Sequence, residues 1–404
     1  MRKKNVVIGL LMLLVFFSGC IHRAKPATTT STTTTMISTK KDLSQVKVAV
    51  LYERVTDGGV VNRSTGDVIS LLKETKTDFV FRGFWKWKAP CFEREEENGY
   101  SYDQLKEAID EIKEEMPDVI FCGSLGVQYL HEKDIDPLTD KPPDIEMLKK
   151  MVFNPSKHGL DMTLDQLGSI LYTRSGGEIG HVPDLTSLEF QRYILDLAEK
   201  QIDSGVDAIW LDGPYGVLTI LMDEGVLDPN DPLIDEYTVS LSEIAEQIRS
   251  YGLSKYNKSI YVGSWGHFPI IHDRPFSDLD FITFTPSSDE VLNKNINKKK
   301  WSTVKEKAGD VPVFVFFDWS MRDDTPLAIF SQRLMPEEQR EFLKNADESF
   351  QENGINFIYP VHGGFMGQSA EKLSFGEFRI YDSLAPEFQT YETIKELALN
   401  KSKS

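Results

Sequence analysis

Short apolar segments alternate with amphipathic helical stretches along most of this 404-residue chain. Strict alternation of strand and helix implies parallel strands joined by right-handed crossovers, and eight such units predict a closed (β/α)8 barrel. Barrels of this α/β class, TIM barrels, reach this length as one domain. The expected strands are 46–52, 79–81, 119–122, 208–211, 259–263, 281–284, 311–317 and 356–359. The expected helices are 67–76, 101–115, 187–204, 238–251, 289–307, 336–352 and 392–399.

Two stretches fit the alternation less regularly. The piece 123–185 has little periodicity, and an insertion of this length is typical of segments that shape a substrate cleft. The fifth crossover, around 269–277, is short and contains proline, so its helix has the weakest support.

The fourth expected strand carries the most specific motif. The segment from Gly205 to Gly216 reads GVDAIWLDGPYG, which places Asp212 at the carboxyl end of a short buried strand. Enzymes with this barrel build their active sites at that end. The segment resembles the fourth strand of sugar-cleaving barrel enzymes, which often reads G-(V/I)-D-(G/A)-(I/F)-x-(L/I)-D. The preceding stretch from Pro183 to Phe190 resembles the way those families enter the helix before this strand, with Leu188 in place of their proline.

The resemblance implies a glycoside hydrolase, which needs two carboxyl groups on either side of the scissile bond. We predict Asp212 and Asp318, which follow strands nearly opposite each other in the barrel, as the catalytic pair. Asp289, Glu290 and Glu53 are the alternative second acids, and a structural role for each acid remains open. Aspartates are one methylene shorter than glutamates, and a gap of ~6.5–9.5 Å between the carboxyls would favour inversion over retention.

Other side chains just beyond the expected strands are rich in aromatic rings and hydrogen-bonding groups, which suit the apolar faces and polar rims of sugars. For the histidines among them, a structural imidazole is an equally good interpretation. The predicted substrate-binding residues are Glu53, Arg82, Trp85, Trp87, Tyr215, Trp265, His267, Trp319 and His362. No Cys/His cluster has zinc-ligand spacing, and no GxGxxG or Walker loop occurs, so the sequence predicts neither a metal nor a cofactor.

The N-terminus is typical of an exported protein. A basic start is followed by an apolar run, 6–17, and by Ser18-Gly19-Cys20. Cys20 in this position resembles the lipidated cysteine of secreted lipoproteins, whereas a plain signal peptide is the alternative. We therefore predict a signal segment (1–20), a Thr-rich linker (21–45), the barrel (46–399) and a polar tail (400–404). This order indicates a domain held by a lipid anchor at the outer face of a membrane.

Charge and cysteines restrict the partners further. The formal charge is −18, and removal of the signal segment takes away three more positive residues, so nucleic acid is a poor partner. Cys91 and Cys122 either pair or remain buried thiols. Two rival functions remain, a lipid-anchored solute-binding protein of a transporter and a sugar-binding barrel without catalysis. A two-lobed fold would favour the first.

Overall fold

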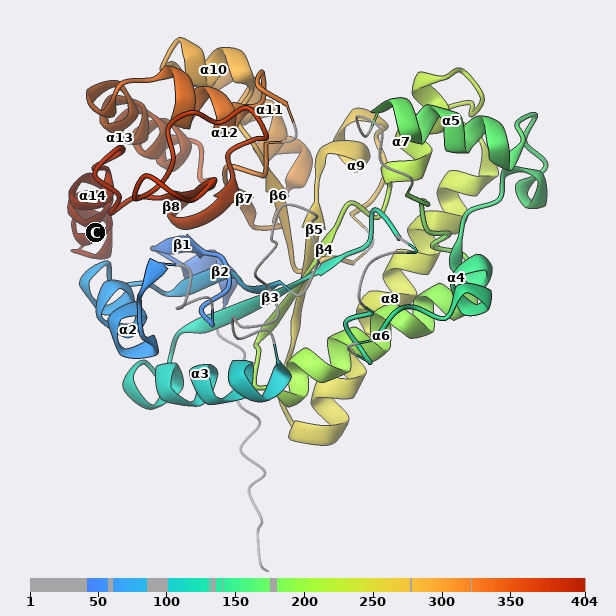
Figure 1. Ribbon diagram of the computed structural model, residues 1–404, viewed down its shortest axis with the longest axis horizontal. Helices are drawn as coiled ribbons and strands as arrows, with labels where there is room; N and C mark the ends of the chain where they lie inside the picture. Colours follow the sequence, from blue (N-terminus) through green and yellow to red (C-terminus); the bar gives the residue numbers. More distant parts are fainter. Residues whose placement is uncertain are drawn as a thin grey trace, which may run out of the picture. The chain divides into compact units, whose positions relative to one another are not determined.

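Eight parallel strands close into a barrel in the computed structural model, with strand order β1 to β8 and β1 paired to β8 (Figure 1). The structure describes residues 42–56, 61–85, 101–130, 132, 136–139, 141–174, 180–276, 278–320 and 322–403, all within one unit, Ser38–Ser404. The strands are β1 (Ala49–Tyr52), β2 (Phe79–Trp85), β3 (Ile120–Gly126), β4 (Ala208–Asp212), β5 (Tyr261–Trp265), β6 (Phe281–Phe284), β7 (Val313–Val315) and β8 (Asn356–Phe365). A ninth strand, β9 (Ile380–Asp382), pairs antiparallel with β8. The predicted (β/α)8 barrel is confirmed, and the two-lobed architecture is not adopted.

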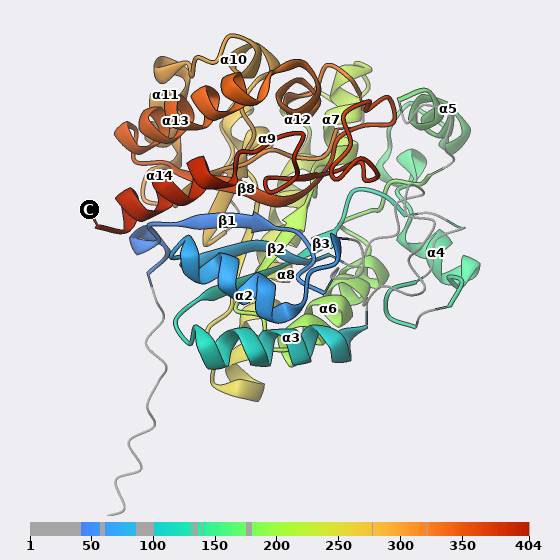
Figure 2. The ribbon, with the colours of Figure 1, turned by 60° about the vertical axis from the view of Figure 1, so that its left-hand side comes forward.

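Helices cover the outside of the barrel, as Figures 1 and 2 show. They include α2 (Thr65–Glu74), α3 (Tyr102–Glu115), α6 (Leu188–Asp203), α8 (Pro232–Tyr256), α11 (Lys298–Ala308), α13 (Pro336–Glu352) and α14 (Tyr391–Lys403). The other helices are α4 (Ile145–Met151), α5 (Leu164–Arg174), α7 (Gly216–Asp223), α9 (His267–Ile271), α10 (Ser288–Leu292) and α12 (Pro326–Ala328). Capping residues define where several helices begin. Ser64 and Asp67 form a reciprocal capping box at the start of α2, and Ser101 and Gln104 form one at the start of α3.

Several element boundaries differ from the sequence prediction for local reasons. The expected helix 289–307 is two helices, since Asn297 caps a new start for α11. α8 begins earlier than expected, at Pro232 behind the cap of Asp231. α14 continues beyond Leu399 to Lys403, because Lys401 is buried and its Nζ lies 3.1 Å from Asp347 Oδ1. The irregular piece 123–185 contains α4, α5 and a 3-10 turn, Pro155–His158.

The barrel interior is filled with aromatic rings. Phe79 on β2 contacts the rings of Phe281 on β6 and Phe314 on β7, at centroid distances of 5.7 and 5.2 Å. One layer higher, Phe81 packs against Trp210 and Phe316, at 5.2 and 4.8 Å. Contacts between strands that are not neighbours are possible only across the barrel axis, so the interior is a packed core and not a pore.

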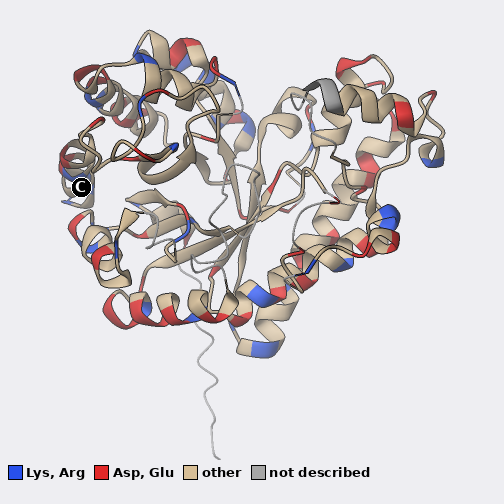
Figure 3. Cartoon of the chain, in the orientation of Figure 1, with Lys and Arg blue, Asp and Glu red and all other residues tan. Residues whose placement is uncertain are grey.

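Charged side chains lie mainly on the outer helices, where Figure 3 shows both signs interspersed, while the strands are largely uncharged. Leu43, within the predicted linker, is buried, so the packed unit extends slightly before the expected start at residue 46. The predicted signal segment with Cys20, the Thr tract, Trp87 and Cys91 lie outside the described residues. In the part of the chain that the structure describes, no helix is long and apolar enough to cross a bilayer.

Candidate active site

Asp212 ends β4 at the carboxyl face of the barrel. Its Oδ1 accepts hydrogen bonds from Trp265 Nε1 at 2.7 Å and from Gln128 Nε2 at 3.0 Å. Only 6% of Asp212 is exposed. Burial and, to a lesser extent, the charge of Asp318 raise the pKa of Asp212 to about 7, against the opposing influence of Arg82 and the two donors. Both donors are neutral, so nothing bonded to this carboxyl compensates a full negative charge.

Asp318 follows β7 and has a different environment. Arg82 Nη1 donates to its Oδ1 at 2.8 Å, and 31% of the Asp318 side chain is exposed. Partial removal from water raises its pKa, while the guanidinium of Arg82 works in the opposite direction. The negative charge on Asp318 raises the pKa of Asp212, so the ionisation of one acid affects that of the other. The structure therefore brings the two predicted acids into interaction.

Arg82 is held in an aromatic enclosure on β2. Its guanidinium carbon lies 3.5 Å from the ring centroid of Trp85 and within 6 Å of the rings of Trp210 and Trp319. The backbone at Arg82 has φ +55°, at an irregularity in the β2–β3 register. A residue with a Cβ adopts this left-handed conformation at a cost, which the enclosure and the ion pair with Asp318 offset. Arg82 is fully buried, and its charge is paired with two acids, Asp318 at 2.8 Å and Glu53 at 3.9 Å.

Glu53, just beyond β1, is bonded on both oxygens. Trp319 Nε1 lies 2.9 and 3.0 Å from them, and the backbone N–H of Gly364 donates to Oε2 at 2.9 Å. A Cβ on Gly363, where φ is +123°, would lie only 2.3 Å from Glu53 Cβ. Glycine at 363 thus permits the close approach of β8 to Glu53. Glu53 Oε1 also lies 3.9 Å from Arg82 Nη2, so Glu53 fixes Trp319, the end of β8 and the arginine of the site.

Aromatic side chains surround the two acids. Trp85 packs on Trp319 at 5.2 Å between ring centroids, and Trp265 packs on Phe316 at 5.1 Å. Trp265 and Trp319 are both partly exposed, whereas Trp85 is buried. Tyr215 stacks on Phe268 at 4.6 Å and is also buried. Of the predicted aromatic residues that the structure describes, Trp265 and Trp319 are thus the ones that solvent reaches beside the acids.

The two predicted histidines lie in different surroundings. His362 on β8 is buried, and its Nδ1 lies 2.7 Å from Asp382 Oδ2 on β9. Arg63 bonds the same carboxylate at 3.0 and 3.2 Å and also donates to Tyr52. His267 begins α9 and lines a hollow of about 500 Å³ with side chains of α11. The structure therefore places His362 in a buried ionic cluster, and His267 against the rings of Trp265 and Phe284, at centroid distances of 5.4 and 4.8 Å.

The alternative second acids on α10 are not part of the site. Glu290 caps its own helix through Ser287, accepts from Trp301 Nε1 at 2.7 Å and pairs with Lys300 at 2.8 Å. Although burial acts to raise the pKa of Glu290, Lys300 and the backbone donors hold it below its usual range. Asp289 is exposed on the first turn. The structure therefore gives Glu290 a structural role on α10 and leaves Asp289 at the surface.

Sequence reasoning missed several residues of the site. Gln128 lies in the irregular piece after β3, where no periodic pattern marks it. Its side chain packs against Gly213, which has φ +71°, and a Cβ on Gly213 would lie 2.0 Å from the Gln128 side chain. Trp210, inside β4, donates from Nε1 to Thr283 Oγ1 at 3.0 Å.

Cys122 is a buried free thiol. Among the described residues, no group of three or more His, Cys, Asp and Glu side chains is placed to hold a metal.

Comparisons with known proteins extend the fold assignment. No protein-family model matches the sequence, and no curated protein matches it. Among solved structures, an Anoxybacillus alpha-amylase is 13% identical, with TM-score 0.52, and the match covers 88% of this chain and 79% of that one. An alpha-amylase from H. orenii is 11% identical, with TM-score 0.52, covering 89% and 82%.

A Flavobacterium johnsoniae GH31 dextranase is 12% identical with TM-score 0.46, and the match covers 87% of this chain but 39% of the dextranase. At these identities the likeness concerns the fold. The chain has a (β/α)8 barrel of the kind found in glycoside hydrolases.

Proposed function

We propose that this protein hydrolyses glycosidic bonds of an oligo- or polysaccharide, with Asp212 and Asp318 as the catalytic pair. The observation that carries the proposal is the contrast between these two interacting carboxyls. Asp212 is bonded only to neutral donors, whereas Asp318 is bonded to a guanidinium. Such a contrast separates the proton affinities of two acids, and glycoside cleavage needs one protonated and one ionised carboxyl.

The environments suggest a division of roles. Asp212, with a pKa of about 7, carries a proton at mildly acidic pH and would donate it to the leaving glycosidic oxygen. Asp318 would be the ionised partner, because Arg82 stabilises its negative charge. It would act on the sugar directly or through a water. Arg82 would then position the reacting carboxylate rather than bind substrate.

The surroundings favour a neutral sugar. Trp265 and Trp319 offer partly exposed aromatic faces beside the acids. Such faces pack against the C–H faces of sugars. The chain carries a net charge of −18, and the acids of the site add to the local negative potential, so a polyanionic glycan would be repelled.

The function is tested by incubating the purified barrel with a panel of neutral polysaccharides and measuring the release of reducing ends. We expect hydrolysis of at least one polysaccharide by the native chain and none by the double variant Asp212→Asn/Asp318→Asn. Calorimetry with the double variant then separates binding from cleavage. Saturable binding to a glycan that the native protein leaves intact would support a sugar-binding barrel without catalysis, and would refute the hydrolase.

We also propose that the barrel acts at the outer face of a membrane, held there by a lipid on Cys20. Support comes from the basic start, the apolar run and the Ser18-Gly19-Cys20 sequence, followed by a Thr-rich stretch that suits a solvated stalk.

Cys20→Ala is expected to abolish lipid attachment, so that the protein is released from membranes or accumulates unprocessed. Membrane fractionation and the mass of the mature N-terminus measure this result, with Ser18→Ala as the matched control that keeps the cysteine. A variant without Cys20 that is processed and fractionates like the native protein would contradict the anchor.

A further inference from the structure

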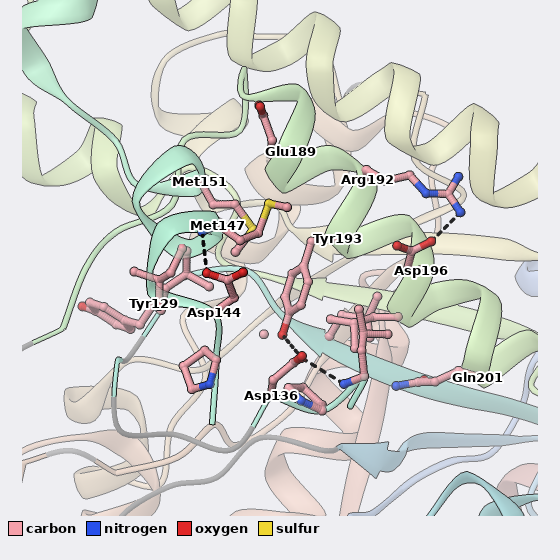
Figure 4. Close-up of a pocket in the computed structure, with 18 of the residues that line it drawn as sticks. Tyr129, Asp136, Asp144, Met147, Met151, Glu189, Arg192, Tyr193, Asp196 and Gln201 are labelled. Carbon is pink, nitrogen blue, oxygen red and sulfur yellow. Dashed lines mark hydrogen bonds and ion pairs between the residues drawn. The ribbon is translucent and has the colours of Figure 1, made fainter. Parts of the chain in front are cut away.

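A cavity of about 490 Å³ lies outside the barrel, between the end of β3, α4 and α6. Apolar side chains of Leu125, Leu148, Met151 and Leu197 line it. Figure 4 shows Met147 and Met151 beside Tyr193, with Tyr129 at another wall. Protein interiors rarely leave voids larger than one water molecule, and cavities of ~300–1,000 Å³ are typical of small-molecule sites. The size and the lining are those of a ligand site.

The mouth of the cavity carries exposed apolar side chains. Leu188, the first residue of α6, is 76% exposed, and Met147 on α4 is 45% exposed. Both line the cavity. Apolar side chains left in water at the mouth of an apolar cavity are covered when a ligand with an apolar body enters.

The polar groups of the cavity wall indicate which functional group a ligand with an apolar body would carry. Tyr193 donates to Asp136 Oδ1 at 3.2 Å (Figure 4). Asp136 also accepts from Leu138 N and from Thr139 Oγ1. Gln201 lines the cavity, is 1% exposed and donates from Nε2 to the Ser124 carbonyl. Within the described part of the chain, no donor reaches Gln201 Oε1. That oxygen packs against Gly123 of β3, where a Cβ would lie only 1.8 Å away, so a ligand at this wall meets Asp136 and Tyr193.

Charge selects among ligands. Four carboxylates line the cavity, those of Asp136, Asp144, Glu189 and Asp196. Among the described lining residues, Arg192 is the one cationic side chain, and it pairs with Asp196 and, at 3.4 Å, with Glu199. An anionic ligand would meet net negative charge with no unpaired cation in these walls.

We propose that this cavity is a binding site for a small amphipathic molecule with an apolar, ring-sized body and a cationic or neutral donor group, an amine in preference to an alcohol. The site is separate from Asp212 and Asp318, and the proposal does not depend on hydrolysis.

The test uses three probes of equal shape and different charge: naphthylethylamine, naphthylethanol and naphthylacetate. The native protein, labelled with ¹³C at its methionine methyl groups, is titrated with each and followed by NMR. We expect the signals of Met147 and Met151 to shift together and saturate with the amine, with Met222 and Met366 unmoved. The alcohol should bind more weakly than the amine, and the acetate at least about tenfold more weakly.

Two variants at the mouth, Leu188→Asn and Met147→Asn, should each weaken amine binding by at least about fivefold. Leu253→Asn changes a 55% exposed leucine on α8, outside the cavity, and should leave the affinity unchanged. Met151 reports binding in the Met147 variant. The proposal is overturned if none of the probes gives a saturable shift at Met151, if the acetate binds as tightly as the amine, or if the mouth variants bind like Leu253→Asn.

Discussion

Asp212→Asn and Asp318→Asn are each expected to lower the turnover of a glycan substrate by about 10²- to 10⁴-fold, the range that a general acid or base contributes. Asparagine keeps the shape of each side chain and its acceptor oxygen, so the bonds to Trp265 and Arg82 remain possible. What is lost is the proton that Asp212 would donate and the negative charge that Asp318 would supply. The measurement is kcat for reducing-end release, with folding checked by thermal unfolding.

The pH profile provides the more specific signature. An acid must be protonated to act, so the rate of the native protein should fall as the pH rises through about 7, the pKa of Asp212. The charge of Asp318 helps to raise the pKa of Asp212. In Asp318→Asn that pKa should be lower, so the residual rate should begin to fall at a lower pH than the rate of the native protein.

Asp289→Asn is the matched control, because this exposed aspartate on α10 should leave both rate and profile unchanged. Near-normal hydrolysis by Asp318→Asn would remove Asp318 from the pair. Near-normal hydrolysis by Asp212→Asn would reject the whole mechanism.

Asp382→Ala is expected to reduce the free energy of unfolding by about 3–5 kcal/mol, the usual cost of leaving a buried charge without its partner. Asp382 is completely buried, accepts two bonds from Arg63 and lies against His362. The side chain of Arg63 is only 9% exposed, so water cannot replace the lost carboxylate. Urea unfolding at neutral pH measures the loss. Glu115→Gln, in an exposed ion pair with Lys73, should have little effect.

The same cluster predicts a pH dependence. Burial acts to raise the pKa of Asp382, but His362 and Arg63 outweigh it and hold this pKa below the ordinary value. A depressed pKa in the folded state stabilises the protein above the pKa of the unfolded chain, and this contribution is lost as the pH falls through the folded value. The native protein should therefore lose stability in strong acid, below about pH 4, more steeply than Asp382→Asn. Equal acid sensitivity of the two would contradict the assigned ionisation.

The sequence was sufficient for the barrel because burial on both faces makes each parallel strand a short apolar run between turn-forming residues. The same pattern located Asp212, because β4 ends where its apolar run ends. The partners of the acids were harder to predict. Arg82 and Asp318 are 236 residues apart, and only closure of the barrel brings them together.

The remaining misses also have physical causes. Gln128 and Asp382 lie in segments without periodicity, so no local pattern marks them, although each bonds a residue that the sequence had singled out. The histidines were ambiguous from the start. A histidine beside a strand end fits a sugar or a carboxylate equally well, and the choice for His362 depended on a strand, β9, that three residues form.

The pairing of β1 with β8 has a consequence for how the chain acquires its structure. The bond between Gly364 N and Glu53 spans 311 residues, and that between Arg63 and Asp382 spans 319. Contacts so distant in sequence form slowly, because the chain must give up conformational entropy to close a long loop before the contact stabilises it. During synthesis the edge of β1 has no permanent neighbour on that side until β8, Asn356–Phe365 of the 404 residues, emerges. A chain shortened before β8 would therefore keep most of its strands and helices and yet expose an open sheet edge, which is prone to pair with other chains.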